Sequence, residues 1–240
     1  MKKYFSIIFL ILILLVCVFT TDRPMKAVKS FFVTKLGTES KQVTIIIDPG
    51  HGGRDPGKVG VNNALEKDVN LKIAFKLKKL LEDDGITVIM TREEDVGLYS
   101  ETDSNKKRAD LNNRVDLIES SKADLAISIH QNSFTEEYVK GAQVFYYQKS
   151  VIGKNLAEMI QNQLKETMAD DNHRKAKANT SYYMLTKTEC PLVIVECGYM
   201  SNFKEADLLI NDDYQNKLAL GISLAILDFL DKGGLEKPAV

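Results

Sequence analysis

The hydrophobic and polar positions of the chain follow two different periods from about residue 43 onward. Short apolar runs that end in turn residues predict strands, because a strand buried on both faces has a continuous apolar sequence. Runs of this kind occupy residues 43–48, 86–90, 125–130, 143–147, 182–185 and 192–196. We therefore predict that these segments are the strands of a sheet.

Between the runs, apolar residues recur at every third or fourth position, which is typical of an amphipathic helix. Val69, Ile73, Leu77 and Leu81 form one such face, and lysines occupy the opposite one. The same spacing recurs in residues 111–118, 152–164 and 218–229. Strands that alternate with helices predict an α/β fold with a mostly parallel sheet covered by helices.

The first 24 residues have the layout of a secretory signal. Lys2-Lys3 precede an almost wholly apolar segment over residues 4–19, and polar residues close it. The apolar segment is shorter than the roughly 20 residues that span a bilayer comfortably. Residues 1–24 are therefore either a signal peptide that is removed or an N-terminal membrane anchor. Val16 before Cys17 disfavours lipidation, because that signal requires a small residue there.

Residues 25–42 have the composition of a linker. Lysines are interleaved with Phe31-Phe32-Val33, which predicts a spacer, with weak contact to a membrane surface as the alternative. The strand and helix patterns then begin, so we assign residues 43–232 to one folded domain and residues 233–240 to a C-terminal tail.

Charge and cysteine content narrow the function classes. The formal net charge of −1 argues against nucleic acid as the main partner. Cys190 and Cys197 flank the last predicted strand, and seven extended residues span roughly 23 Å. A disulfide requires Cα atoms within about 7 Å of each other. Both cysteines are therefore predicted to be core thiols, with a metal role for Cys197 as a minor alternative.

Two of the three histidines stand at the carboxyl ends of predicted strands. His51 follows Asp48-Pro49-Gly50, which stops the first strand, and His130 ends the run at residues 125–130. In open α/β sheets this edge is where sites form. A surface turn would explain one such histidine, but two placed in this way indicate a shared site.

Two carboxylates have comparable positions. Glu66 stands on a loop rich in Gly and Asn just before the first predicted helix, where the helix dipole alone would favour it. Glu196 ends the run at residues 192–196, and a carboxylate after so apolar a strand is costly to bury unless it is paired or functional. Both are therefore candidates for the site of the histidines.

Two imidazoles and one carboxylate make up the three-ligand set of a catalytic Zn²⁺ site, in which water takes the open position. Such an ion polarises a carbonyl group and lowers the pKa of water to about 7. A second carboxylate that is not a ligand then moves protons, and Glu196 meets this requirement. The wide spacing of the ligands and the lack of paired cysteines argue against a structural zinc finger.

Four separated motifs resemble those of the zinc-dependent N-acetylmuramoyl-L-alanine amidases. They are IDPGHGG at residues 47–53, GVNNALEK at 60–67, SIHQN at 128–132 and VECGYMSN at 195–202. Their order is that of the family, and the resemblance covers about residues 43–231. The residues 43–232 are thus expected to form a zinc amidase catalytic domain.

The resemblance implies a six-stranded mixed, mostly parallel sheet of the phosphorylase/hydrolase-like kind. It implies cleavage of the amide between the lactyl group of N-acetylmuramic acid and the L-alanine of the peptidoglycan stem. It also implies that one Zn²⁺ ion is held by His51, Glu66 and His130, with Glu196 as the catalytic acid/base.

A small exported amidase of this kind is similar to the spore-cortex amidases, which remove stems before muramic lactam forms. This similarity predicts a role in cortex maturation and germination. It also predicts a location outside the cytoplasmic membrane, either associated with that membrane or in the cell wall or spore intermembrane space.

Four residues are candidates for substrate contact. Arg114 matches a family arginine, and a structural ion pair is an equally good explanation for it. Asn132 belongs to the third motif. Lys175 and Lys177 belong, with His173 and Arg174, to a basic loop that either lines a groove for an anionic stem or is only exposed. The neighbouring His173 as a zinc ligand is a minor alternative.

Two rival functions stay open from the sequence. One is a noncatalytic peptidoglycan-binding homologue, and the other is a different zinc hydrolase of cell-wall peptides. For regulation, we expect an activating or targeting protein partner, because the chain shows no wall-binding repeat. The loop that carries Glu66 is expected to be mobile, so that a partner would raise zinc affinity by ordering it.

Overall fold

The computed structural model describes residues 42–236. The predicted signal peptide or anchor, nearly all of the predicted linker and the last four residues of the tail lie outside the described residues, so those assignments stay predictions. Within residues 42–236, no helix is both long enough and apolar enough to cross a membrane.

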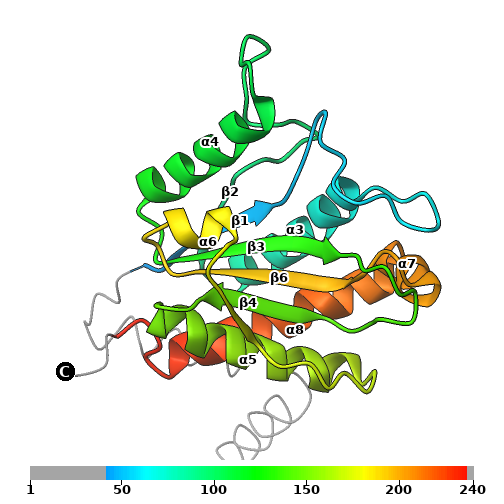
Figure 1. Cartoon of the computed structure of the whole chain (residues 1–240). Coiled ribbons are helices and arrows are strands. Elements are labelled where there is room, and N and C mark those ends of the chain that lie inside the picture. Colours follow the sequence, from blue (N-terminus) through cyan, green and yellow to red (C-terminus); the bar gives the residue numbers. More distant parts are fainter. Residues whose placement is uncertain (1–41, 237–240) are drawn as a thin grey trace, which may run out of the picture. The chain divides into compact units, whose positions relative to one another are not determined.

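A single six-stranded sheet forms the centre of the described domain (Figure 1). Its strands are β1 (Thr44–Pro49), β2 (Thr87–Met90), β3 (Leu125–Asn132), β4 (Gln143–Tyr147), β5 (Lys177–Asn179) and β6 (Leu192–Tyr199). Their order is β2-β1-β3-β6-β4-β5, and every neighbouring pair is parallel except β4 with β6. The predicted α/β class with a mixed, mostly parallel sheet is confirmed.

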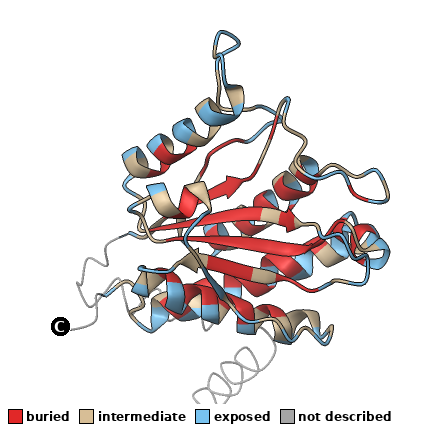
Figure 2. Ribbon diagram, viewed as in Figure 1, coloured by how far each residue is buried: buried red, intermediate tan, exposed pale blue. Residues whose placement is uncertain are grey.

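Helices cover the two faces of the sheet unequally. The helices are α3 (Glu66–Asp83), α4 (Lys106–Ser121), α5 (Val151–Met168), α6 (Tyr183–Lys187), α7 (Phe203–Leu209) and α8 (Asp212–Asp231). The larger apolar cluster packs α3, α5 and α8 on one face, and the smaller one packs α4 and α6 on the other. The central strands are buried along most of their length, whereas the long helices each keep an exposed side (Figure 2).

The alternation of side chains decides which residues face which layer. On β6, Val193 and Val195 belong to the larger cluster, whereas Leu192 and Ile194 belong to the smaller one. Because successive side chains of a strand point to opposite faces, Glu196 lies on the α4/α6 face. That face is the less fully covered one, which leaves room for a site at its carboxyl edge.

One predicted strand is wrong. Residues 182–185 fall almost entirely within helix α6, and the edge place in the sheet belongs to β5 instead. The Thr186 amide donates to the Tyr182 carbonyl, while Met184 and Leu185 are both buried in the smaller cluster. A four-residue apolar run does not distinguish a strand from one helical turn. The exposed β5 has no apolar run that would reveal it.

Candidate active site

The carboxyl ends of β1 and β3 place the two histidines beside each other, with ring centroids 5.0 Å apart. His51 follows β1 in a left-handed conformation with φ of 63°, which is strained for a residue other than Gly. Two contacts hold it there. Arg114 Nη2 donates to the His51 carbonyl over 2.6 Å, and the backbones of Gly52 and Asp55 bond to each other.

Glu66 brings the predicted metal ligands together. Its Oε1 lies 3.2 Å from His51 Nε2 and 3.0 Å from His130 Nδ1. One ligand atom from each of these three residues lies within 4.8 Å of the other two, and no other such group occurs among residues 42–236. The sequence-based ligand set is thus assembled at one point.

The surroundings of the cluster fix each ligand. Asp55 Oδ2 lies 2.9 Å from His51 Nδ1, which orients the ring so that Nε2 faces Glu66. Glu66 Oε1 also accepts from the Gln131 amide over 3.1 Å, and its Oε2 accepts from the Lys58 amide over 2.8 Å. Glu66 is the first residue of α3 and only 2% exposed. The expectation of a loop ligand is therefore wrong, because Glu66 begins a helix, and the mobility of its segment stays a prediction.

The charges of the cluster depend on one another. Burial favours the neutral form of His51, but hydrogen bonds and charges from Asp55 and Glu66 outweigh it and raise the His51 pKa to about 9. Burial likewise opposes ionisation of Glu66, and the two imidazoles outweigh it and hold its pKa far below the ordinary value. Without a metal ion, protonated His51 and ionised Glu66 therefore form an ion pair, and a metal ion binds the cluster in competition with protons.

Two glycines leave the space that the cluster needs. A Cβ on Gly50 would lie 2.1 Å from the His130 ring, and a Cβ on Gly57 would lie 2.5 Å from Glu66 Oε2. Gly57 also has φ of 70°, a conformation that favours glycine. Only glycine at these positions lets the ring and the carboxylate approach the backbone so closely.

Glu196 is the neighbour of the cluster on the next strand. It pairs in register with His130, so both side chains lie on the same face of the sheet. It is only 8% exposed, and its Oε2 is buried without a hydrogen-bond partner in the described residues. Burial, together with the negative charge of Glu66 and against the attraction of both histidines, raises its pKa to about 7.

These features meet the requirements of a catalytic zinc site. Two imidazoles and one carboxylate are its usual protein ligands, and a second carboxylate remains beside them. An unpartnered buried carboxylate oxygen is rare in native proteins and points to a group that contacts it in the working state.

Arg114 and Arg92 brace the turn that carries His51. Arg114 is 2% exposed, and its Nη1 lies 2.6 Å from Asp48 Oδ1, while Nε lies 2.7 Å from Asp110. Arg92 donates to the carbonyls of Pro49, Gly50 and Lys67. These contacts favour the structural ion pair for Arg114.

The sequence reasoning missed Arg92. It follows Thr91 directly after β2, which is the same kind of strand-end position that identified the histidines. Burial, with help from the neighbouring Arg114, lowers the Arg92 pKa to about 10. The strand-end rule would have found this residue if it had been applied to cations as well.

The remaining predicted residues are not among the ligands of the cluster. Asn132 ends β3, where its side chain accepts from the Ser133 amide over 2.8 Å. Lys175 and Lys177 are exposed on and beside β5. His173 is 87% exposed and paired with Asp171, and it takes no part in the cluster.

Both cysteines of the described domain are free, as predicted. Cys197 is buried and Cys190 is partly buried. Burial raises the pKa of the Cys190 thiol to about 12. Neither belongs to the cluster of metal-ligating groups.

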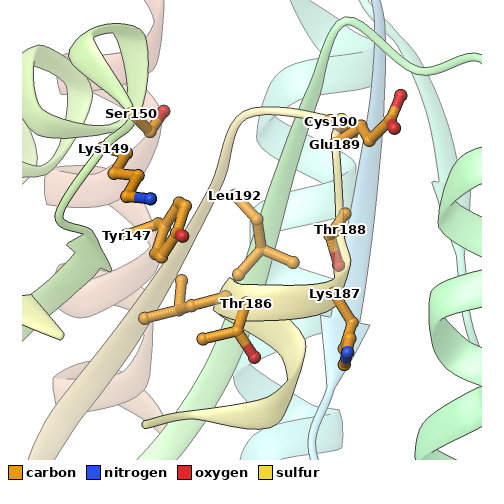
Figure 3. A pocket seen from close by; sticks show the side chains of 10 residues that line it. Tyr147, Lys149, Ser150, Thr186, Lys187, Thr188, Glu189, Cys190 and Leu192 are labelled. Carbon is orange, nitrogen blue, oxygen red and sulfur yellow. The ribbon is translucent and has the colours of Figure 1, made fainter. Parts of the chain in front are cut away.

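The hollow beside the candidate metal ligands is not the largest one in the described domain. A small hollow of about 60 Å³ adjoins the cluster, with His51, Asp55, Arg114, His130 and Met184 among its lining residues. A much larger one of about 510 Å³ lies at the opposite end of β6 (Figure 3). Its lining includes Tyr147, Lys149 and Thr188 but no group of metal ligands. We therefore place the chemistry at the small hollow.

Comparison with known families decides what the domain is. Residues 45–228 match the family model described as N-acetylmuramoyl-L-alanine amidase. The chain belongs to the N-acetylmuramoyl-L-alanine amidase family. The resemblance seen in the four motifs is confirmed, and so is the prediction that this chain is a hydrolase of this class.

Individual relatives agree with the family. A germination-specific N-acetylmuramoyl-L-alanine amidase from Bacillus subtilis is 41% identical over 193 residues, which is 79% of this chain and 81% of the relative. The structure of the CwlD amidase from Clostridioides difficile, in complex with the GerS lipoprotein, superposes with a TM-score of 0.77 at 39% identity. That superposition covers 80% of this chain and 100% of the amidase.

A more distant solved relative shares the same fold. The catalytic domain of CwlV, an N-acetylmuramoyl-L-alanine amidase from Bacillus (Paenibacillus) polymyxa, has a TM-score of 0.69 at 29% identity. It covers 79% of this chain and 99% of that domain. The amidase fold thus extends over nearly all of the described part of the chain.

Proposed function

We propose that this amidase uses one Zn²⁺ ion, held by His51, Glu66 and His130, to release peptide stems from peptidoglycan. The bond cleaved is the amide between the lactyl group of N-acetylmuramic acid and L-alanine. The observation that carries the proposal is the buried, unpartnered oxygen of Glu196 beside an assembled set of two imidazoles and one carboxylate.

Each group of the site has a distinct role. Zn²⁺ at the cluster supplies Lewis acidity, which polarises the scissile carbonyl and makes water more acidic. Glu196 takes the proton of the attacking water and gives it to the departing L-alanine nitrogen. With a pKa near neutrality, Glu196 suits both transfers, because a general base and acid works best near the operating pH.

The surroundings of Glu66 and Glu196 shift their pKa values in opposite directions, which suits them to different roles. The two imidazoles that face Glu66 hold its pKa far below the ordinary value in the metal-free site, and the ionised form is also the one that a metal ligand needs. Burial raises the pKa of Glu196, so its carboxylate accepts a proton more readily than an exposed one. Such a separation between neighbouring acids is a common means of assigning acid/base roles.

Metal analysis and product analysis on the purified protein test the proposal together. We expect about one zinc per chain, and mass spectrometry of digested peptidoglycan should show free stems that begin with L-alanine. A noncatalytic homologue would release nothing, and another zinc peptidase would cut within the stem. Either of these results would overturn the proposal.

We also propose that the amidase acts in spore cortex maturation, on stems that are removed before muramic lactam forms. The 41% identity to a germination-specific amidase supports this role. A strain lacking the protein should make cortex without muramic lactam, and reintroducing the wild-type chain should restore it. Normal muramic lactam in the deletion strain would exclude this role.

The proposed place of action is outside the cytoplasmic membrane. The basic and apolar residues 1–24 and the cell-wall substrate of the relatives support export. Whether residues 1–24 are removed or kept as an anchor can be read from the mass of the mature protein. Retention of the full chain in the cytosolic fraction would contradict export.

A protein partner is the last part of the proposal. The complex of the Clostridioides difficile relative with a lipoprotein supports a partner that targets or activates the domain at a membrane. Zinc content and turnover of residues 25–240, with and without candidate partners, test it. Full zinc content and turnover for the isolated domain, unchanged by any partner, would count against activation.

A further inference from the structure

The face of the sheet that carries Glu196 continues across β4 to β5. Gln143 on β4 stands directly opposite Glu196 in the antiparallel pair, and Phe145 stands opposite Lys177 in the parallel pair. Directly opposed residues point to the same face, and neighbouring strands lie about 4.8 Å apart. Side chains along this edge therefore flank Glu196 on the side away from His130.

Arg174 is fixed at this edge. Its Nε donates to the Lys140 carbonyl over 2.8 Å, and its Nη1 donates to Gln143 Oε1 over 3.3 Å. The guanidinium carbon lies 4.7 Å from the centre of the Tyr199 ring, a stacking distance for a cation on an aromatic face. Arg174 is thus attached to the residue that stands across from Glu196.

The guanidinium keeps hydrogen-bonding capacity. Arginine has five N–H donors, and the two bonds named above use two of them. Even with the Tyr199 hydroxyl as a third acceptor, two donors of Arg174 remain for a ligand in the described part of the chain. The rigid planar fork of arginine is suited to binding a carboxylate.

The direction of the substrate follows from the role of Glu196, so this step rests on the proposed function. The acyl part of the scissile amide belongs at the metal cluster on the β3 side. The departing nitrogen belongs at Glu196, which protonates it. The peptide that continues from this nitrogen therefore extends over the β4/β5 edge, where Arg174 and Lys177 lie.

We propose that Arg174 is a specificity-determining residue that binds a free carboxylate of the stem peptide close to the scissile bond. An extended peptide advances about 3.3 Å per residue. A carboxylate on the second stem residue therefore falls about one strand spacing from Glu196, over Gln143, whose side chain Arg174 contacts. The exposed Lys177 adds positive charge along the same face.

A purely structural role predicts a different outcome. Arg174 joins the segment before β4 to the segment before β5 through its bond to the Lys140 carbonyl. If this were its only task, replacing it would lower stability and would affect every substrate equally. The acid-to-amide ratio of substrate turnover is therefore the readout that separates the two roles.

The experiment uses two muropeptides that differ only at the second stem residue, which carries either a carboxylate or a carboxamide. We expect the full-length wild-type enzyme to cleave the carboxylate form with a kcat/KM about tenfold to a hundredfold higher, since a hydrogen bond between charged groups is worth that much. Arg174→Gln should bring the ratio close to one, mainly through KM, and Arg174→Lys should restore it only in part.

Arg108→Gln is the matched control, because Arg108 also stacks on a tyrosine, with its guanidinium carbon 4.6 Å from the Tyr183 ring centre. Its acid-to-amide ratio should equal that of the wild type. Equal cleavage of both muropeptides by the wild type, or an unchanged ratio in Arg174→Gln, would overturn the inference and leave the amidase proposal standing. Cleavage of neither by the wild type would overturn both.

Discussion

The two sides of Glu196 are built in opposite ways. On the β1/β3 side, the charged groups are buried and bonded to one another, as with Arg114, Asp48 and Glu66. On the β4/β5 side, Lys175 and Lys177 are exposed and the edge strand has only three residues. The comparison teaches that the proposed metal ligands are fixed by the fold, whereas the lysines proposed to meet a variable polymer are left accessible.

Burial explains why the first side is rigid. Asp48 accepts hydrogen bonds from Thr91 and Ser128, both over 2.7 Å, in addition to its ion pair with Arg114. A buried charge without such partners would be costly, so each contact depends on the others. The hydrogen bond from Arg114 to the His51 carbonyl ties the turn that carries His51 to this buried network.

The largest expected effect comes from removing a ligand on the rigid side. His51→Ala or His130→Ala should abolish most stem release and lower zinc content, while circular dichroism still shows a folded sheet, since a catalytic zinc is not needed for folding. His173→Ala is the control, because His173 is 87% exposed and outside the cluster. Unchanged zinc content in either ligand variant would remove that residue from the ligand set.

The brace beneath the site should affect stability strongly. Asp48→Asn leaves the Arg114 guanidinium buried without its closest anion, which should lower the free energy of unfolding by about 3–5 kcal/mol. Asp83→Asn, which breaks the exposed pair with Lys79, should cost less than about 0.5 kcal/mol. Urea unfolding measures both, and equal losses for the two variants would contradict a special role of the buried pair.

The same brace predicts an acid dependence. Burial opposes ionisation of Asp48, but Arg114, Ser128 and Thr91 outweigh it and lower its pKa to about 2, below the ordinary 3.8. The stabilisation is therefore complete above about pH 5 and is lost as the pH falls through 3.8 towards 2, a change of about 2 kcal/mol. The difference in unfolding free energy between wild type and Asp48→Asn should shrink over this range. A difference independent of pH would exclude Asp48 as its source.

The smallest effect is expected on the exposed side. Replacing Lys175 and Lys177 together by Gln should raise KM for anionic stems a few-fold at low salt and have little effect at high salt, since exposed charges are screened. Stability should stay unchanged. Lys154→Gln, on the exposed side of α5, is the control. A KM that is unaffected at any salt concentration would leave both lysines without a substrate role.

The sequence predicts the residues of the candidate site better than it predicts the residues that hold them in place. His51, His130 and Glu196 are found because each ends or closely follows a strongly apolar run, and the ends of parallel strands meet at one edge. The sequence identifies Glu66 as a ligand candidate. It does not predict that Glu66 is buried, because the surrounding Gly and Asn residues indicate an open loop. The bonds from Gln131 and Lys58 that bury it come from segments whose arrangement only the fold establishes.

The edge of the sheet is where sequence patterns fail. Tyr182 to Leu185 satisfy the pattern of a strand, yet packing of Met184 and Leu185 onto the α4/α6 face makes them a helical turn. The three exposed residues of β5 show no period at all. Arg92 is missed for a related reason, because a cation in a connecting segment looks like a solvated residue until its partners are known. Arg174 is found only as one member of a basic loop, and the sequence does not indicate its contacts with Lys140 and Gln143.

The most direct test of the central claim measures zinc content and stem release on the same preparation of Glu196→Gln. The claim is that Glu196 transfers protons and is not a metal ligand. Glu196→Gln should keep the zinc content and fold of the wild type while releasing stems about 10²–10⁴-fold more slowly, and His130→Ala in parallel should lose zinc. Near-normal release by Glu196→Gln, or a loss of zinc equal to that of His130→Ala, would contradict the claim.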